Sequence, residues 1–152
     1  MIRLMLLILI PLISFSANAQ MQAGVEQEIA LIKNTIQTAY VEGLQNEGDT
    51  IKINSGFHPG FELLIPSNDG KLEKYSLTAW KAKVKASLAS GKLPRKDEEK
   101  ISVKFLFVDV TGDAAVAKFE FYVGQKLAYM DYQFLYKFWD GWKIVSKIFH
   151  KY

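Results

Sequence analysis

The last third of the chain contains four long runs of strand-forming residues, separated only by two- or three-residue turn sequences. Turns this short join antiparallel neighbours, because a parallel crossover needs a dozen or more residues. We therefore predict an antiparallel meander that forms one long curled sheet. The expected strands are Ile101–Val110, Ala114–Val123, Lys126–Phe138 and Trp142–Tyr152, joined by Thr111-Gly112-Asp113, Gly124-Gln125 and Asp140-Gly141.

Three helices are expected before this sheet. The first, of about 20 residues, is predicted by apolar residues that recur every three or four positions. These residues are Val25, Ile29, Ile32, Ile36, Tyr40 and Leu44. A short second helix is expected to start at residues 49–50, and a third, starting at residues 76–78, carries Trp80 on its apolar face.

The second and third helices are separated by a small predicted hairpin, Phe61–Ile65 with Lys71–Tyr75, and residues 90–100 form a charged surface loop. Three N-terminal helices followed by a curved antiparallel sheet constitute an α+β fold. We expect the helices to lie across the concave face of the sheet and to leave a cone-shaped space between them.

The N-terminus has the three parts of a cleavable secretory signal peptide. Arg3 supplies the positive charge, residues 4–12 are continuously apolar, and small residues precede the expected cleavage point at residue 19. The alternative is a membrane anchor, but a spanning helix needs roughly 20 apolar residues and Pro11 interrupts this run. We expect a signal peptide over residues 1–19, one domain over residues 20–152, no stable membrane anchor, and a periplasmic or secreted location.

Composition excludes several classes of function. The formal net charge of +3 on 152 residues is too small to suggest a nucleic-acid partner. The absence of Cys excludes disulfides, thiol catalysis and a thiolate zinc site. The sequence also lacks HExxH, a glycine-rich phosphate loop and GxSxG. Neither a metal nor a cofactor is therefore expected.

The short turns also predict which side chains face each other across the sheet, because turn length fixes register. If residues 140–141 form one turn, Asp131 faces His150; if residues 124–125 form the other, Lys118 faces Asp131. A β-bulge in either hairpin would shift this register by one residue. The polar residues expected together on one face are Lys118, Asp131, Ser146 and His150.

A carboxylate placed between a lysine and an imidazole stabilises both cations, and such a group can orient a polar ligand or transfer a proton. The alternative is a set of opposite charges that face each other across exposed strands. The lysines of the last strand are expected at an exposed sheet edge, where they keep the edge soluble. They are Lys143, Lys147 and Lys151.

Three further side chains are candidates for ligand contact. His58 lies where the chain passes from helix to strand, at the expected mouth of the cone, and Tyr40 and Trp80 lie on the apolar faces of their helices. Each has a structural alternative, since His58 can cap a turn or pack beside Pro59, and the two aromatic residues can belong to the core.

Several short motifs carry a family resemblance that covers residues 23–151. They are Phe57-His58-Pro59, Asn68-Asp69-Gly70-Lys71-Leu72, residues 109–117, Asp131-Tyr132 and residues 140–150. In these motifs and in the order of its elements the chain resembles the nuclear transport factor 2-like superfamily, and within it the putative lumazine-binding family of small bacterial proteins. The resemblance implies a cone-shaped pocket and commonly a homodimer formed through the sheets. It does not establish that lumazine binds.

The same cone occurs in ketosteroid isomerases, scytalone dehydratase and polyketide cyclases, which use His, Asp or Tyr for acid–base chemistry. No complete catalytic set from these enzymes is present here, so enzyme status stays open. The first expectation is an exported small-molecule-binding protein with Asp131 and His150 as polar determinants of its pocket. The second is a cofactor-free isomerase, dehydratase or cyclase that uses the same two residues, and the third is an interaction module.

Overall fold

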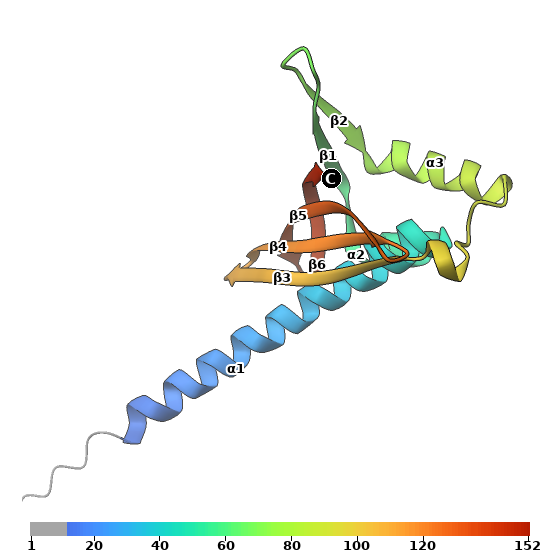
Figure 1. Cartoon of the computed structure of the whole chain (residues 1–152). Coiled ribbons are helices and arrows are strands. Elements are labelled where there is room, and N and C mark those ends of the chain that lie inside the picture. The colour runs from blue at the N-terminus through green and yellow to red at the C-terminus, as the bar shows by residue number, and fades with distance from the viewer. Residues whose placement is uncertain (1–11) are drawn as a thin grey trace, which may run out of the picture.

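The structure, a computed structural model, describes residues 12–152 (Figure 1). Residues 1–11 of the predicted signal peptide lie outside the described residues, and residues 12–19 form the start of α1 (Leu12–Thr35). The helix continues without a break as the π-helix η1 (Ile36–Glu47), which ends at Gly48 in the left-handed conformation (φ 74°). Figure 1 shows the first turns of α1 extending away from the sheet, which explains why Val25 is 40% exposed while Ile32 is buried.

Two short helices begin at the predicted caps. The carboxylate of Asp49 accepts hydrogen bonds from the first backbone N–H groups of α2 (Thr50–Gly56). The hydroxyl of Ser76 accepts one from Ala79 N at the start of α3 (Leu77–Ala89). Both side chains satisfy backbone donors that have no partner within the helix, as the sequence predicted.

The six strands form one mixed, mostly antiparallel sheet in the order β2-β1-β6-β5-β4-β3. The meander of four C-terminal strands and the small hairpin are both confirmed. The strands are β1 (Phe57–Pro66), β2 (Leu72–Ser76), β3 (Ile101–Thr111), β4 (Ala114–Val123), β5 (Lys126–Phe138) and β6 (Gly141–Lys151), with a 3-10 turn, η2 (Asp97–Glu99), before β3. Because β1 pairs in parallel with β6, the last strand lies inside the sheet.

The predicted register of the two C-terminal hairpins is wrong by one residue. The turn at residues 124–125 forms as expected, but a bulge then shifts the pairing, and Lys118 faces Tyr132. In the last hairpin the turn is Trp139-Asp140, and a second bulge follows it, so Asp131 faces Phe149.

This shift divides the predicted polar group between the two faces of the sheet, because alternate residues of a strand point to opposite faces. Asp131 pairs with Phe119 and Phe149 on the face that the helices cover, which we call the inner face. Lys118, Ser146 and His150 pair with the alternate residues of β5 and lie on the other, outer face.

The core lies between the helices and the inner face of the sheet. The helical apolar stripe is buried from Ile32 to Leu44, and it packs against aromatic and aliphatic residues of β4, β5 and β6. The sheet residues at this contact include Phe119, Phe121, Leu135 and Ile144. The α+β class and the arrangement of three helical segments on a curved sheet are those predicted.

Candidate functional site

A buried ion pair lies on the inner face of the sheet. Nζ of Lys147, from β6, lies 2.9 Å from Oδ1 of Asp131, from the neighbouring β5, and the two side chains are 7% and 0% exposed. Oδ1 has no hydrogen-bond partner among the described residues, so this contact is electrostatic rather than an aligned hydrogen bond. Charges this deeply buried are stable in a fold only when they are paired.

Tyr40 completes this group from the helical side. Its hydroxyl donates a hydrogen bond of 2.8 Å to Oδ2 of Asp131. The ammonium of Lys147 lies 5.3 Å from the centre of the Tyr40 ring and 4.9 Å from that of Phe149, within the range of a cation–π contact. The π-helix η1 therefore places a phenol against a carboxylate that the bulge at Ala128 has brought to the inner face. The bulge at Val145 has brought Lys147 to the same face.

Burial shifts the proton affinities of all three groups. Loss of hydration raises the pKa of Asp131, although the Lys147 ammonium and the Tyr40 hydroxyl partly oppose this shift. The same loss of hydration lowers the pKa of Lys147. The pKa of Tyr40 is raised by burial and by the charge of Asp131. Asp131 and Lys147 are thus closer in proton affinity than they are in water.

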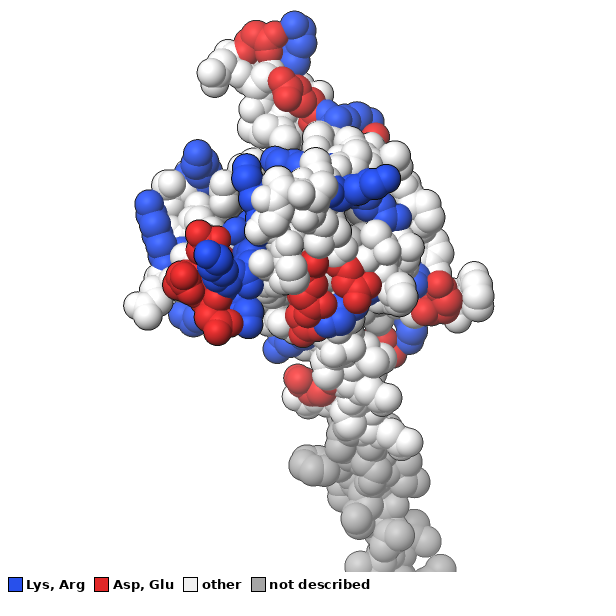
Figure 2. Space-filling view, turned by 90° about the vertical axis from the view of Figure 1, so that its right-hand side faces the viewer, with Lys and Arg blue, Asp and Glu red and all other residues white. Residues whose placement is uncertain are grey.

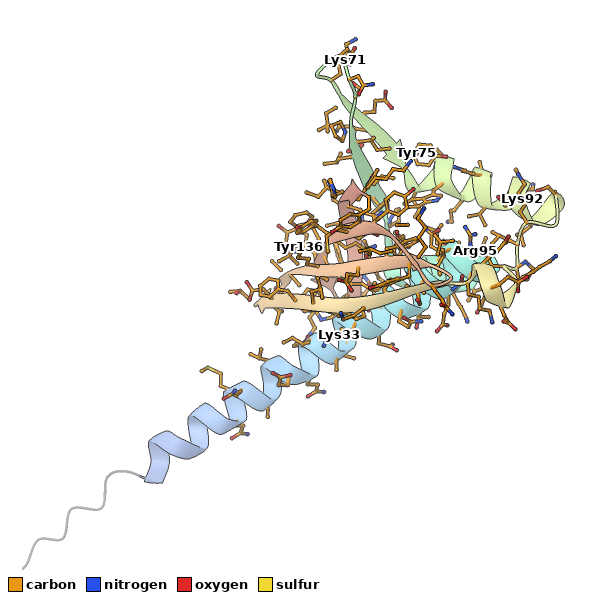
Figure 3. The ribbon with its side chains drawn as sticks, viewed as in Figure 1. Lys33, Lys71, Tyr75, Lys92, Arg95 and Tyr136 are labelled. Carbon is orange, nitrogen blue, oxygen red and sulfur yellow. The ribbon has the colours of Figure 1, made fainter. Side chains whose placement is uncertain are left out.

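A cavity of about 740 Å³ opens beside this group, between α3, η1 and the inner face of the sheet. Tyr40 and Lys147 contribute to its wall, whereas Asp131 lies behind them. Trp80 from α3 packs edge-on against Tyr40, with ring centres 6.1 Å apart. The other aromatic residues of the wall are Phe121, Tyr129 and Phe149. Figure 3 shows the side chains of the sheet and of α3 converging on this region.

The structure brings together three of the seven predicted site residues, Tyr40, Trp80 and Asp131. His58 lies at a separate, smaller cavity of about 390 Å³. There its Nδ1 accepts a hydrogen bond from Gly60 N, and its ring stacks on Phe138.

The remaining three predicted residues lie on the outer face of the sheet. Lys118 packs over the ring of Tyr132, the hydroxyl of Ser146 donates to the carbonyl of Glu62, and His150 packs against Tyr152. The predicted Asp131–His150 pair is therefore wrong, and the partner of Asp131 is Lys147.

Lys147 is the site residue that sequence reasoning missed. The alternating lysines were expected at an exposed edge, yet β1 pairs with that edge of β6, and Lys147 and Lys143 are both buried. The bulge at Val145 places Lys147 on the inner face. Lys143 is satisfied by the carbonyl of Ser55 at 2.7 Å and by Asp140 at 3.0 Å. The parallel pairing joins segments more than 80 residues apart, and no local pattern around Lys147 reveals it.

Within residues 12–152, no group of three or more His, Asp or Glu side chains is arranged to hold a metal ion. No helix in this part of the chain is long and apolar enough to cross a membrane. The inner face instead carries one more polar side chain, Gln133, which is fully buried and whose amide atoms have no hydrogen-bond partner among the described residues.

A helix-covered curved sheet with a cavity between its layers defines a nuclear transport factor 2-like protein. Residues 27–150 match the family model described as putative lumazine-binding, and the chain belongs to this family. No curated protein sequence matches the chain.

Solved structures with the same fold come from several bacteria. A nuclear transport factor 2-like protein of unknown function from Shewanella baltica is 19% identical with a TM-score of 0.63, over 84% of this chain and 95% of that one. Another from Silicibacter pomeroyi is 20% identical with a TM-score of 0.65, over 84% and 98%. A protein from Streptomyces avermitilis, described as a putative dehydratase from the nuclear transport factor 2-like family, is 15% identical with a TM-score of 0.57, over 84% and 98%.

Proposed function

We propose that this protein binds a small organic molecule in the cavity between α3, η1 and the inner face of the sheet. The observation that carries the proposal is the cavity itself, whose volume of about 740 Å³ falls within the range of ligand sites. Aromatic walls supply contact area, and a few polar groups at Tyr40 and Lys147 supply orientation. The membership of the putative lumazine-binding family supports a small-molecule ligand.

The test is thermal unfolding of the full chain against a library of metabolites. A ligand that binds only the folded state stabilises it by mass action, by about 2.7 kcal/mol at a hundredfold excess over its dissociation constant. Ser87→Trp is designed to fill the cavity, since Ser87 is a half-buried residue of its wall. Ala86→Trp is the matched control, because Ala86 is exposed on the same helix and outside the wall.

Library compounds should raise the melting temperature of the wild type and of Ala86→Trp but not that of Ser87→Trp. Stabilisation that persists equally in Ser87→Trp would place the ligand elsewhere. The absence of any stabilising compound for the well-folded wild type would favour the interaction module instead.

A second candidate function is cofactor-free acid–base catalysis in the same cavity, and the buried Tyr40–Asp131–Lys147 group favours it. Lys147 and Tyr40 are the residues that reach the cavity, so one of them would exchange the proton with the substrate and Asp131 would position both. For any compound found above, Lys147→Met should abolish turnover while binding persists. Binding without turnover in the wild type would exclude this candidate for that compound.

Export is part of the proposal and rests on the signal-peptide pattern of residues 1–19. Expression with a C-terminal tag in a Gram-negative host should release a periplasmic protein whose mass corresponds to a chain that starts at Gln20. Recovery of an uncleaved chain from the cytoplasm would contradict this.

A homodimer through the outer face of the sheet completes the proposal. Large apolar side chains remain exposed on that face. A sheet face that no partner covers would present polar side chains to water instead. They are Phe107, Phe134, Tyr136 and Ile148. Lys118 and Glu120 lie on the same face, so a second copy meets charges of both signs. Sedimentation should show a dimer that Phe134→Lys/Tyr136→Lys converts to a monomer, whereas a monomeric wild type would overturn it.

A further inference from the structure

The wall of the large cavity divides by burial into an apolar interior and a charged opening. Its buried members are aromatic or aliphatic apart from Lys147, and they include Tyr40, Leu44, Leu63, Val84 and Phe121. Apart from Val123 on β4, its exposed members lie on the last turns of α3 and on the segment that follows, up to η2. The charged residues of the opening are Lys83, Lys92, Arg95, Lys96 and Glu99.

Positive charge dominates this opening, since four cations face one carboxylate. Among the described residues, none of the four cations lies within ion-pair distance of an acidic side chain. Figure 2, which looks onto this side of the molecule, shows basic side chains flanking a central area of uncharged surface, with acidic side chains below it and to its left. A cleft with apolar walls concentrates the field of such charges and attracts anions.

Arg95 is held in place at this opening. Its side-chain Nε donates a hydrogen bond of 2.8 Å to the carbonyl of Gln45, and its backbone N–H donates to that of Asn46. The guanidinium is therefore already ordered, and its planar fork of donors fits a carboxylate, a phosphate or a sulfonate. Figure 3 shows Arg95 and Lys92 on the same side of the molecule, next to the loop after α3.

The interior of the cavity, by contrast, has no net charge. Lys147 is its single buried cation, and Asp131 neutralises it at 2.9 Å. An anionic group would therefore gain more at the opening than at depth, where it would also lose hydration. The apolar part of a ligand gains most among the buried aromatic rings.

We propose that the ligand is an amphipathic organic anion, with a planar apolar body among the aromatic side chains and its anionic group at the opening, beside Lys83, Lys92, Arg95 and Lys96. The inference rests on the proposed function of the cavity and adds the chemical class and the orientation of the ligand. Neutral and cationic molecules of the same size are therefore not expected to be the preferred ligands.

Two fluorescent probes with the same aromatic body test the class. Anilinonaphthalene sulfonate carries an anionic group, and N-phenyl-naphthylamine is its neutral counterpart. The full chain is titrated with each probe, beside the cavity-filling variant Ser87→Trp. A triple variant then removes three charges of the opening, by Lys83→Gln/Lys92→Gln/Lys96→Gln. Arg95 is kept because its hydrogen bonds hold the loop.

The matched control is Lys33→Gln/Lys71→Gln/Lys85→Gln, which removes the same charge from three exposed lysines outside the cavity wall. Figure 3 shows Lys33 and Lys71 far from Lys92 and Arg95. We expect the triple variant of the opening to weaken binding of the sulfonate about tenfold and that of the neutral probe by less than about twofold. Added salt should weaken only the sulfonate.

Equal affinity of the wild type for the two probes would overturn the anion inference while leaving the cavity as a binding site. An equal loss in the control triple variant would also overturn it, because the effect would then be one of net charge. Failure of both probes to bind, or binding that Ser87→Trp does not reduce, would instead count against the proposed function of the cavity.

Discussion

The hydroxyl of Tyr40 reaches across the core from η1 and donates a 2.8 Å hydrogen bond to Oδ2 of Asp131 on β5. This contact joins the helical layer to the sheet at a point where both side chains are buried. It also fixes one of the two oxygens of the carboxylate, which leaves the other to Lys147.

Tyr40→Phe removes this donor while keeping the ring. The Asp131 oxygen then loses a partner in a buried site, so the free energy of unfolding should fall by about 1–3 kcal/mol. Tyr75→Phe is the control, since the Tyr75 hydroxyl makes a longer bond of 3.2 Å to a backbone carbonyl in a half-buried place. Urea denaturation of both variants checks the difference, and equal losses would contradict the role assigned to the Tyr40 bond.

Lys147→Met leaves Asp131 as a buried charge without its cation. The free energy of unfolding should fall by about 3–5 kcal/mol, and the double variant Asp131→Asn/Lys147→Met should recover part of this loss. Lys71→Met at the exposed pair with Asp69 should change stability much less. A double variant as unstable as the sum of its singles would show that the two residues do not interact.

The free energy of unfolding should depend on pH in a way that reflects the shifted pKa values of Asp131 and Lys147. The folded-state pKa of Asp131 is raised above its ordinary value of 3.8, so the folded state binds the proton more tightly. The stability of the wild type relative to Asp131→Asn should therefore fall as the pH rises from about 3.8 through the raised value. Urea denaturation across this range measures the difference.

The folded-state pKa of Lys147 is lowered from its ordinary value of 10.5, so the folded state releases its proton first. The stability of the wild type relative to Lys147→Met should then rise as the pH approaches 10.5. If neither the stability difference between wild type and Asp131→Asn nor that between wild type and Lys147→Met changes with pH, the burial of both charges is contradicted.

Glu28 fastens α1 to the last hairpin. Its carboxylate accepts a 2.6 Å bond from Lys137 and a 2.7 Å bond from the indole N–H of Trp142. These bonds lower its pKa below 4.5, and so its contribution is present above that value and is lost as the pH falls through the lowered one. Glu28→Gln should reduce stability at neutral pH by about 1 kcal/mol, because the site is partly exposed. This loss of stability in Glu28→Gln should become smaller as the pH falls through the lowered pKa of Glu28.

Gly43 allows η1 and α2 to pack closely. A Cβ at this position would lie 2.8 Å from Cβ of Lys52 and 3.0 Å from the backbone nitrogen of Ile53. Gly43→Ala should therefore destabilise the protein by about 1–3 kcal/mol through overpacking. Gly24→Ala, in α1 with nothing within 4 Å, should be neutral or stabilising by up to about 1 kcal/mol. The opposite order of the two effects would contradict this packing.

The elements of this fold could be predicted because their signals are local. Asp49 and Ser76 bond to backbone groups two or three residues away, and turn residues bound the strands. The register could not be predicted, because the hairpins contain extra residues, Ala128 and Val145, that a turn-based alignment does not reveal. The last turn is also Trp139-Asp140 rather than the predicted Asp140-Gly141. The bulge at Ala128 moved the β4 partner of Asp131 by one position, and the displaced turn together with the bulge at Val145 moved its β6 partner by one.

The π-helix did leave a signal that our sequence reasoning did not use. Ile32, Ile36, Tyr40 and Leu44 are spaced by four residues throughout, and all four are buried. In an α-helix of 3.6 residues per turn, each step of four drifts by about 40° around the axis. A helix with i→i+5 bonds has a wider turn, in which a step of four falls short of a full turn instead of exceeding it. A four-residue spacing therefore keeps a stripe aligned where α-helical and π-helical turns are combined.

The interior position of β6 has a consequence for the order in which the molecule can fold during synthesis. Hairpin β1–β2 joins the rest of the sheet only through β6, by pairings such as Phe57 with Ile144 and Leu63 with Lys147. The strands β1 to β5 precede β6 in the chain, and until β6 emerges from the ribosome the first hairpin has no strand to extend and Asp131 has no cation. The nascent chain therefore completes its sheet and its buried ion pair in one late step, when β6 inserts between β1 and β5.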